Sequence, residues 1–179
     1  IGPDCFNGEE NPYFFEDKAL FNDWLSVAKH DGLSLKIGRW NTPGTPIAFL
    51  VDFKASYADK NKFYGELWER YGVDSLHAYG DYDDSAMFSY ATAKVVESFF
   101  RFYLCNCTNV IFHANEWQTG FAALALQHDV PEIATIFTTH ATGIGRSIAG
   151  NNKPLYDYLQ AYNGDQMADE LNMQSKHSI

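Results

Sequence analysis

The sequence predicts an α/β protein built in layers. Short runs of β-branched and aromatic residues alternate with longer stretches of helical periodicity, and apolar residues make up 46% of the chain, enough to fill a core. A strand, a helix and a second strand follow one another between Asn109 and Thr138. This order is typical of a βαβ unit with parallel strands and a right-handed crossover. The 179 residues suit one domain.

The first half of the chain is expected to hold two helices and two strands. In order, we expect an irregular stretch over residues 1–15, a helix over Glu16–Lys29, a strand over Ser34–Trp40, a turn over Asn41–Pro46, a strand over Ile47–Phe53 and a helix over Tyr57–Tyr71. Gly72 is expected to end the last helix. The spacing places Trp24 and Ala28 on the inner face of the first helix, with Leu20 and Val27, and places Phe63, Leu67 and Trp68 on that of the second.

The second half begins with the longest helix and then forms the βαβ unit. The helix is expected to take Asp81 or Asp83 as its N-cap and to bury a face at three-to-four spacing: Phe88, Ala91, Val95, Phe99 and Phe102. The βαβ unit is expected as a strand over Val110–His113, a helix over Glu116–His128 and a strand over Ile133–Thr138. The segment from Thr142 to Arg146, with two glycines, is expected to be a flexible turn.

Polar residues collect where the two parallel strands end. His113 is expected at the carboxyl end of one strand and His140 just past the other, with Glu116 nearby. Ligands of open α/β sheets bind outside these ends, and Arg146 could clamp an anion through paired hydrogen bonds. Two alternatives stay open: the histidines only cap strands, or His113, Glu116 and His140 form a metal site of two histidines and one carboxylate.

Composition and missing motifs narrow the function. The net charge of −10 argues against a nucleic-acid partner, which would need clustered basic residues. The sequence lacks a long apolar span, a leader peptide, a nucleophile elbow, a complete dinucleotide fingerprint and a phosphate-binding loop. Three cysteines give no disulfide framework, so we expect a cytoplasmic protein. Because it starts at Ile1 without a methionine, we treat the chain as a piece of a longer protein.

Several ordered motifs resemble those of the eukaryotic-type, UDP-glucose-dependent glycogen synthases. They are Ile1-Gly-Pro3, Gly38-Arg-Trp40, Gly65-Glu-Leu-Trp68, His113-Ala-Asn-Glu-Trp117 and Thr138-Thr-His-Ala-Thr142 followed by Gly145-Arg146. The resemblance covers nearly the whole chain. Asn115 is a departure, because the family usually has a second histidine there.

The resemblance implies a fold and a reaction. It implies that residues 1–179 are an incomplete amino-terminal, Rossmann-like three-layer domain with a mainly parallel sheet, half of a two-domain GT-B glycosyltransferase. The first strand with its glycine-rich loop and the carboxyl-terminal domain would lie outside the chain. The whole enzyme would add glucose from UDP-glucose to the non-reducing end of an α-1,4-glucan with retention, and the fragment alone would be inactive.

The resemblance also implies roles for single residues. His140 would approach the donor glucose and Arg146 would neutralise charge on the leaving diphosphate, both as catalytic residues. His113, Glu116, Trp117 and Thr139 would bind substrate. No metal and no cofactor are expected. The expected partners are the nucleotide sugar and the glucan, and no binding to nucleic acid or membrane is expected. The full-length protein could form a homo-oligomer.

Two further hypotheses come from other classes. A non-enzymatic glucan-binding module is motivated by Trp40, Trp68, Trp117 and eleven tyrosines, since aromatic faces bind sugars. A metal-dependent hydrolase would use His113, Glu116 and His140. The preference between UDP- and ADP-glucose, the oligomeric state and allosteric control are not specified by these residues.

Overall fold

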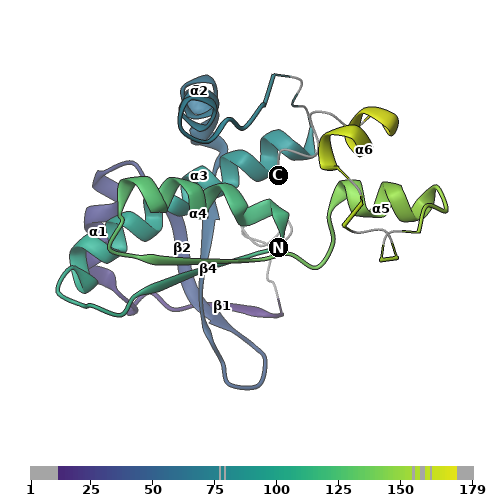
Figure 1. Cartoon of the computed structure of the whole chain (residues 1–179). Helices are drawn as coiled ribbons and strands as arrows, with labels where there is room; N and C mark the ends of the chain where they lie inside the picture. The colour runs from purple at the N-terminus through teal and green to yellow at the C-terminus, as the bar shows by residue number, and fades with distance from the viewer. Residues whose placement is uncertain are drawn as a thin grey trace.

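The computed structural model describes residues 12–76, 78, 80–154, 156–157, 160–161 and 163–172, and they form a mixed α/β fold (Figure 1). The strands are β1 (Phe14–Glu16), β2 (Ser34–Trp40), β3 (Ile47–Asp52), β4 (Ile111–Asn115) and β5 (Ala134–Thr138). The α-helices are α1 (Asn22–His30), α2 (Lys60–Tyr71), α3 (Asp81–Phe99), α4 (Gly120–Asp129), α5 (Gly143–Gly150) and α6 (Gly164–Glu170). The α/β class is therefore confirmed. The Ile1-Gly-Pro3 motif, Cys5 and residues 173–179 lie outside the described residues.

The strands form two separate sheets in the described part of the chain. One sheet has the order β1-β2-β3 and is antiparallel, and the other pairs β4 with β5 in parallel. The parallel arrangement was predicted for the βαβ unit, where it is confirmed. The first sheet departs from a mainly parallel pattern because the short Asn41–Pro46 turn joins β2 directly to β3, and a short turn allows only antiparallel pairing.

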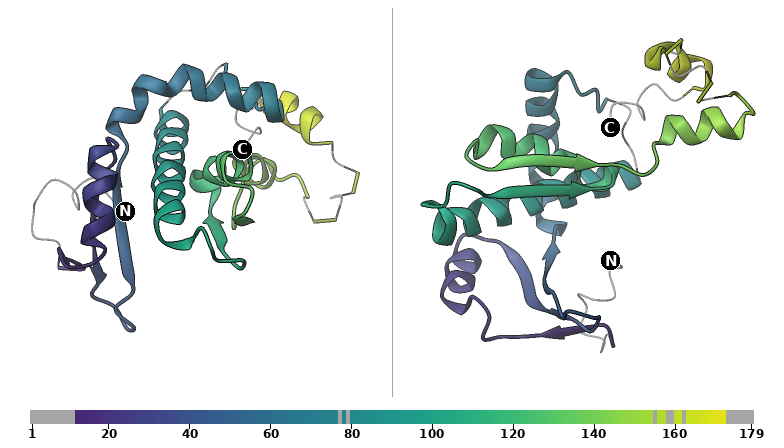
Figure 2. Two further views of the ribbon diagram at one scale, coloured as in Figure 1. Left: turned by 90° about the vertical axis from the view of Figure 1, so that its left-hand side faces the viewer. Right: turned by 60° about the horizontal axis from the view of Figure 1, so that its bottom comes forward.

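Helix α3 lies between the two sheets (Figure 2, left). On one side its Val95 packs with Trp24 and Ala28 of α1 and with Leu35 and Ile37 of β2. On the other side the helix contributes to a second core together with α2 and α4; this core contains Phe63, Leu67, Ala86, Met87, Phe121 and Leu126. The helix is therefore apolar over much of its surface because it has a core to fill on both sides.

Several predicted boundaries needed correction. The predicted helix from Glu16 begins at Asn22, and Phe14–Glu16 is the edge strand β1, because these three residues pair with Gly38–Trp40 of β2. Gly80, with φ 61°, stands at the N-cap of α3, not Asp81 or Asp83. The expected end of α2 is confirmed, since Gly72 has φ 68°, its N–H donates to the Trp68 carbonyl, and the N–H of Val73 donates to the Leu67 carbonyl.

Three residues assigned to inner faces are exposed. Trp68 is 59% exposed on α2, Val27 is 41% exposed on α1 and Phe102 is 42% exposed after the end of α3. Phe102 lies in the π-helical segment η3 (Phe100–Leu104), and the wider turn of a π-helix shifts the register of the inner face. Cys105 and Cys107, which follow it, are exposed free thiols.

An acidic pair fixes the start of α3 against α2 and the 3-10 helix η2 (Lys54–Asp59). Asp83 accepts hydrogen bonds from the Lys60 ammonium at 3.0 Å and from the Tyr64 hydroxyl at 2.6 Å, and Asp84 accepts one from the Tyr57 hydroxyl. Burial and the Asp84 carboxylate raise the pKa of Tyr57 to about 12. These two aspartates therefore join the start of α3 to α2 and η2.

Candidate functional site

The βαβ unit brings the predicted site to one edge. Strands β4 and β5 pair from Ile111 opposite Ala134 to Asn115 opposite Thr138, so both strands end at the same level. Helix α4 crosses between them and packs on one face with Phe121, Ala122 and Leu126 buried. In Figure 1 the strands run towards α5, and the segment after β5 leads directly into that helix. The carboxyl ends of the two parallel strands therefore lie at one edge of the sheet, as the βαβ pattern in the sequence predicts.

His113 does not end its strand. Strand β4 continues for two residues beyond the prediction, to Asn115, which puts His113 in mid-strand with its side chain exposed. The Nε2 atom of the ring lies 2.9 Å from the Oγ1 atom of Thr138 on β5. The ring is held on the face opposite Phe112 and Ala114, which face the core.

Glu116 follows the end of β4 and is joined to the same residue of β5. Its N–H donates a hydrogen bond of 2.7 Å to the carbonyl of Thr138. The backbone has φ 71° and ψ 156°, a region that residues other than glycine seldom occupy. Thr138 thus contacts both His113 and Glu116, two of the predicted substrate-binding residues.

Trp117 and Thr139 lie just after the ends of β4 and β5. Trp117 begins the 3-10 helix η4 (Trp117–Thr119) and is half-buried. Thr139 is exposed, and its hydroxyl donates a 3.1 Å hydrogen bond to the carbonyl of Ala141. The Thr139 bond shapes the loop that carries His140.

His140 and Arg146 lie after β5, and both side chains are exposed. His140 is two residues beyond the end of the strand. Arg146 lies in the first turn of α5, which corrects the expectation of a flexible glycine turn there. The helix begins here because the Thr142 hydroxyl accepts a 3.0 Å hydrogen bond from the Gly145 N–H, an N-cap that compensates for two poor helix formers.

Hydrogen bonds connect some of the predicted site residues and not others among the described residues. Hydrogen bonds through Thr138 join His113 and Glu116, and two backbone steps connect Thr138 with His140. Arg146 follows six residues after His140, in the first turn of α5. Sequence reasoning assigned no role to Thr119, whose hydroxyl donates to the carbonyls of Asn115 at 2.9 Å and Glu116 at 3.0 Å. The predicted helix over Glu116–His128 placed Thr119 inside a helix, whereas α4 begins at Gly120 with Thr119 at its N-cap, so no local signal marked this residue.

The residues do not gather as a metal site would. Within the described residues, no three His, Cys, Asp or Glu side chains lie close enough together to hold a metal ion. The ring nitrogen of His113 is instead turned towards the Thr138 hydroxyl. The metal-dependent hydrolase thus finds no support in the donor geometry.

The aromatic residues of the binding-module hypothesis lie on three different elements. Trp40 on β2 packs edge-on against Phe14 with ring centroids 5.6 Å apart, Trp68 is exposed on α2 and Trp117 is on η4. No ring contact within the described part of the chain joins any two of these tryptophans. They do not form one aromatic platform.

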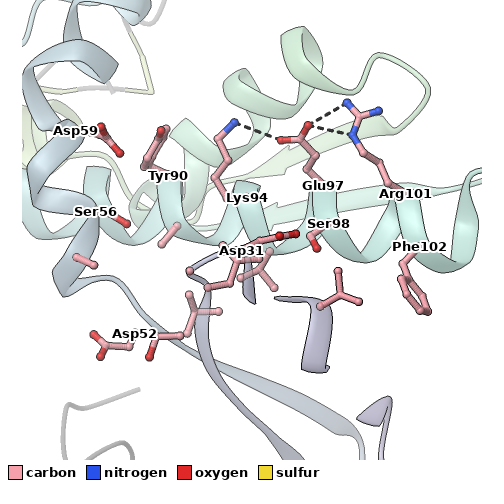
Figure 3. A pocket seen from close by; sticks show the side chains of 18 residues that line it. Asp31, Asp52, Ser56, Asp59, Tyr90, Lys94, Glu97, Ser98, Arg101 and Phe102 are labelled. Atoms are coloured by element: carbon pink, nitrogen blue, oxygen red, sulfur yellow. Dashed lines mark hydrogen bonds and ion pairs between the residues drawn. The ribbon is translucent and has the colours of Figure 1, made fainter. Parts of the chain in front are cut away.

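A cavity of about 600 Å³ opens elsewhere, between the α1–β2 turn, the β3–η2 junction and α3 (Figure 3). Its polar side chains include Asp31, Asp52 and Asp59. Lys94 contacts Glu97 at 3.2 Å and Asp129 at 3.1 Å, and Arg101 contacts Glu97 at 2.9 Å. None of the predicted site residues lines this cavity. It is therefore separate from the edge of the βαβ unit.

The charged network beside the cavity shifts two pKa values. Burial alone would lower the pKa of Lys94, but its contacts with Asp129 and Glu97 outweigh this and raise it. Burial alone would raise the pKa of Asp129, but hydrogen bonds from His128 and Lys94 outweigh this and lower it. Both groups are therefore held in their charged forms.

In the described residues, no helix has the length and apolar character needed to cross a membrane.

Comparisons with known proteins point to a single family. The family model described as glycogen synthase matches residues 7–179. The liver glycogen [starch] synthase of Rattus norvegicus is 31% identical over 154 residues, which cover 86% of this chain and 21% of the relative. The liver glycogen [starch] synthase of Homo sapiens is 30% identical over 160 residues, which cover 86% of this chain and 22% of the relative. The glycogen [starch] synthase of Neurospora crassa is 28% identical over 157 residues, which cover 87% of this chain and 22% of the relative.

The chain thus spans about a fifth of the length of the curated relatives it matches. The matched region includes the whole βαβ unit with His113, Glu116, His140 and Arg146. The extent of the family match decides the assignment: this chain belongs to the glycogen synthase family.

Proposed function

We propose that this chain is part of the amino-terminal, acceptor-side domain of a retaining glucosyltransferase that moves glucose from UDP-glucose to the non-reducing end of an α-1,4-glucan. Family membership supports glycosyl transfer for glycogen synthesis. The observation that carries the proposal is the joining of His113 and Glu116 through Thr138, two residues before His140. Substrate-binding groups of α/β proteins belong at this edge.

Each predicted residue takes a defined part in the proposed reaction. His140 contacts the donor glucose near the reacting carbon. Arg146 offsets the negative charge that grows on the diphosphate as UDP leaves, a stabilisation that is larger in the transition state than in the ground state. His113, Glu116, Trp117 and Thr139 bind the sugar and the acceptor. The proposal requires no metal and no cofactor besides the donor substrate.

The domain organisation is part of the same proposal. Residues 1–179 form an incomplete Rossmann-like half of a GT-B enzyme, and the remaining strand, glycine-rich loop and carboxyl-terminal domain come from the rest of the polypeptide. The small parallel sheet with its crossover helix α4 supports this organisation. A fragment with half of a cleft lacks most of the nucleotide site, so we expect it to be inactive alone.

The test is transfer of radiolabelled glucose from UDP-glucose to glycogen by the full-length protein. We expect incorporation that β-amylase then releases, because that enzyme acts only on α-1,4 linkages from the non-reducing end. A parallel reaction with ADP-glucose determines the donor preference, and the 1–179 fragment serves as the inactive comparison. If neither UDP-glucose nor ADP-glucose gave incorporation of glucose into glycogen, the proposed function would be contradicted.

A glucan-binding module remains the second candidate, and the exposure of Trp68 favours it. This indole is 59% exposed on α2, and the neighbouring Gly65 has open space around it. Electrophoresis of the fragment through a gel containing glycogen separates the two functions. Strong retardation that Trp68→Ala removes would support a binding module, and unchanged mobility would exclude it.

A further inference from the structure

The backbone of Glu116 is the strained point of the candidate site. Its φ of 71° and ψ of 156° place it in a region that is essentially confined to glycine, because a Cβ atom crowds the backbone there. The strain occurs immediately after β4, at the carboxyl edge of the parallel pair. Such a conformation persists only where the surroundings fix it.

Two residues fix the peptide groups on either side of Glu116. The N–H of Glu116 donates to the Thr138 carbonyl at 2.7 Å, and its carbonyl accepts from the Thr119 N–H at 3.0 Å. The Thr119 hydroxyl lies 3.0 Å from the same carbonyl and 2.9 Å from that of Asn115. The single hydroxyl proton is thus shared between the carbonyls before and after the strained Cα atom.

We propose that Thr119 is a positioning residue that directs the Glu116 carboxylate into the glucosyl-transfer site by holding this backbone conformation, an inference that rests on the proposed function. Rotation of φ towards ordinary negative values swings the Cα–Cβ bond and turns the carboxylate in a different direction. Loss of the hydroxyl removes the restraint on the two carbonyls. A strained glutamate where a glycine would fit without cost indicates that the side chain, not only the turn, is needed.

The test compares Thr119→Val with Thr119→Ser in the full-length protein, using UDP-glucose and glycogen. Valine keeps the shape of threonine but has no donor, so we expect a fall in kcat/KM for the glucan of about tenfold to a hundredfold, with the KM for UDP-glucose nearly unchanged. Serine keeps the hydroxyl and should restore most of the activity. Thr92→Val is the matched control, because the Thr92 hydroxyl is buried on α3 without a hydrogen-bond partner among the described residues.

A double-mutant cycle shows whether Thr119 acts through Glu116. In a Glu116→Gln background, Thr119→Val should cause little further loss, since the carboxylate that it positions is already absent. Full additivity would overturn the proposal, as would a Thr119→Val enzyme that behaves like the Thr92→Val control. An inactive wild-type enzyme would refute the proposed function itself and the proposal with it.

The strain has a readout that does not use activity. Glu116→Gly relieves the backbone strain, whereas Glu116→Ala retains the Cβ atom that causes it. The glycine variant should therefore melt at a higher temperature than the alanine variant, the reverse of the usual order at an unstrained position. A higher melting temperature for the alanine variant would show that Glu116 is not strained, and the role given to Thr119 would be overturned.

Discussion

The ring of His113 and the hydroxyl of Thr138 are joined across the two parallel strands, with Nε2 and Oγ1 2.9 Å apart. The directly opposite neighbour of His113 in the register is Ile136, so this contact runs diagonally towards the carboxyl end of β5. The hydrogen bond ties a predicted substrate-binding ring to the strand that leads to His140. It therefore connects the two strands where the site is formed.

Replacing Thr138 by valine should affect activity more than stability. The lost hydrogen bond lies on an exposed face, so we expect a decrease of about 0.5–1 kcal/mol in the free energy of unfolding. The freed His113 ring should lower glucosyl transfer by the full-length protein several-fold. Thermal unfolding and UDP-glucose turnover measure the two effects, with Thr138→Ser as the control that keeps the bond. Unchanged turnover in the valine variant would show that the orientation of His113 is unimportant.

Two glycines should respond to alanine with opposite signs. A Cβ atom at Gly38 would lie 2.0 Å from the Phe15 carbonyl oxygen and 2.6 Å from the Phe14 ring, so β1 must move away. We expect Gly38→Ala to destabilise the protein by about 1–3 kcal/mol. Gly65 on α2 has open space around it, and Gly65→Ala should stabilise by about 0.5–1 kcal/mol. Equal unfolding temperatures for the two variants would contradict this account.

Thr92 offers a stabilising substitution. Its hydroxyl is buried without a hydrogen-bond partner among the described residues, and burial of an unpaired polar group is unfavourable. Thr92→Val keeps the shape of the side chain and removes that group. We expect an increase of about 1 kcal/mol in the free energy of unfolding, measured by denaturant titration beside Thr92→Ser. A destabilised valine variant would mean that the hydroxyl has a partner after all.

Acid should weaken the contact between α3 and the end of α4. The pKa of Asp129 is below its usual value of 3.8 in the folded protein, because bonds from His128 and Lys94 outweigh the opposing effect of burial. A lowered folded pKa gives stability that is present above the unfolded value and lost as the pH falls through the folded value. The stability difference between wild type and Asp129→Asn should therefore shrink as unfolding is measured from pH 6 to pH 3. A constant difference would exclude this linkage.

The βαβ unit was predictable because its signals are local. Val110, Ile111 and Phe112 form an apolar run, and a second run ends at Thr138, with a helical pattern between them. Parallel pairing then follows because a helix between two strands returns the chain to the end of the sheet where the first strand began. The carboxyl edge, and with it the neighbourhood of His113, Glu116 and His140, could be located from this reasoning alone.

Other features depend on contacts that the local sequence does not contain. Strand β1 is three residues long and exists through its pairing with β2 around Gly38. Trp68 has the spacing of an inward residue, yet α2 turns it to the surface. The backbone of Glu116, which has a positive φ, is hydrogen-bonded to Thr138 on one side and to Thr119 on the other. Nothing in the identity of a glutamate signals a positive φ.

Arg146→Ala in the full-length protein tests the central claim most directly, with turnover of UDP-glucose onto glycogen as the measurement. The guanidinium lies in the first turn of α5, after the loop that carries His140, and is proposed to stabilise the leaving diphosphate. We predict a fall in kcat of at least about a hundredfold with an unchanged melting temperature. Arg70→Ala, which removes an ion pair with Glu66 within α2, should retain nearly full turnover. Wild-type turnover in Arg146→Ala would contradict the account.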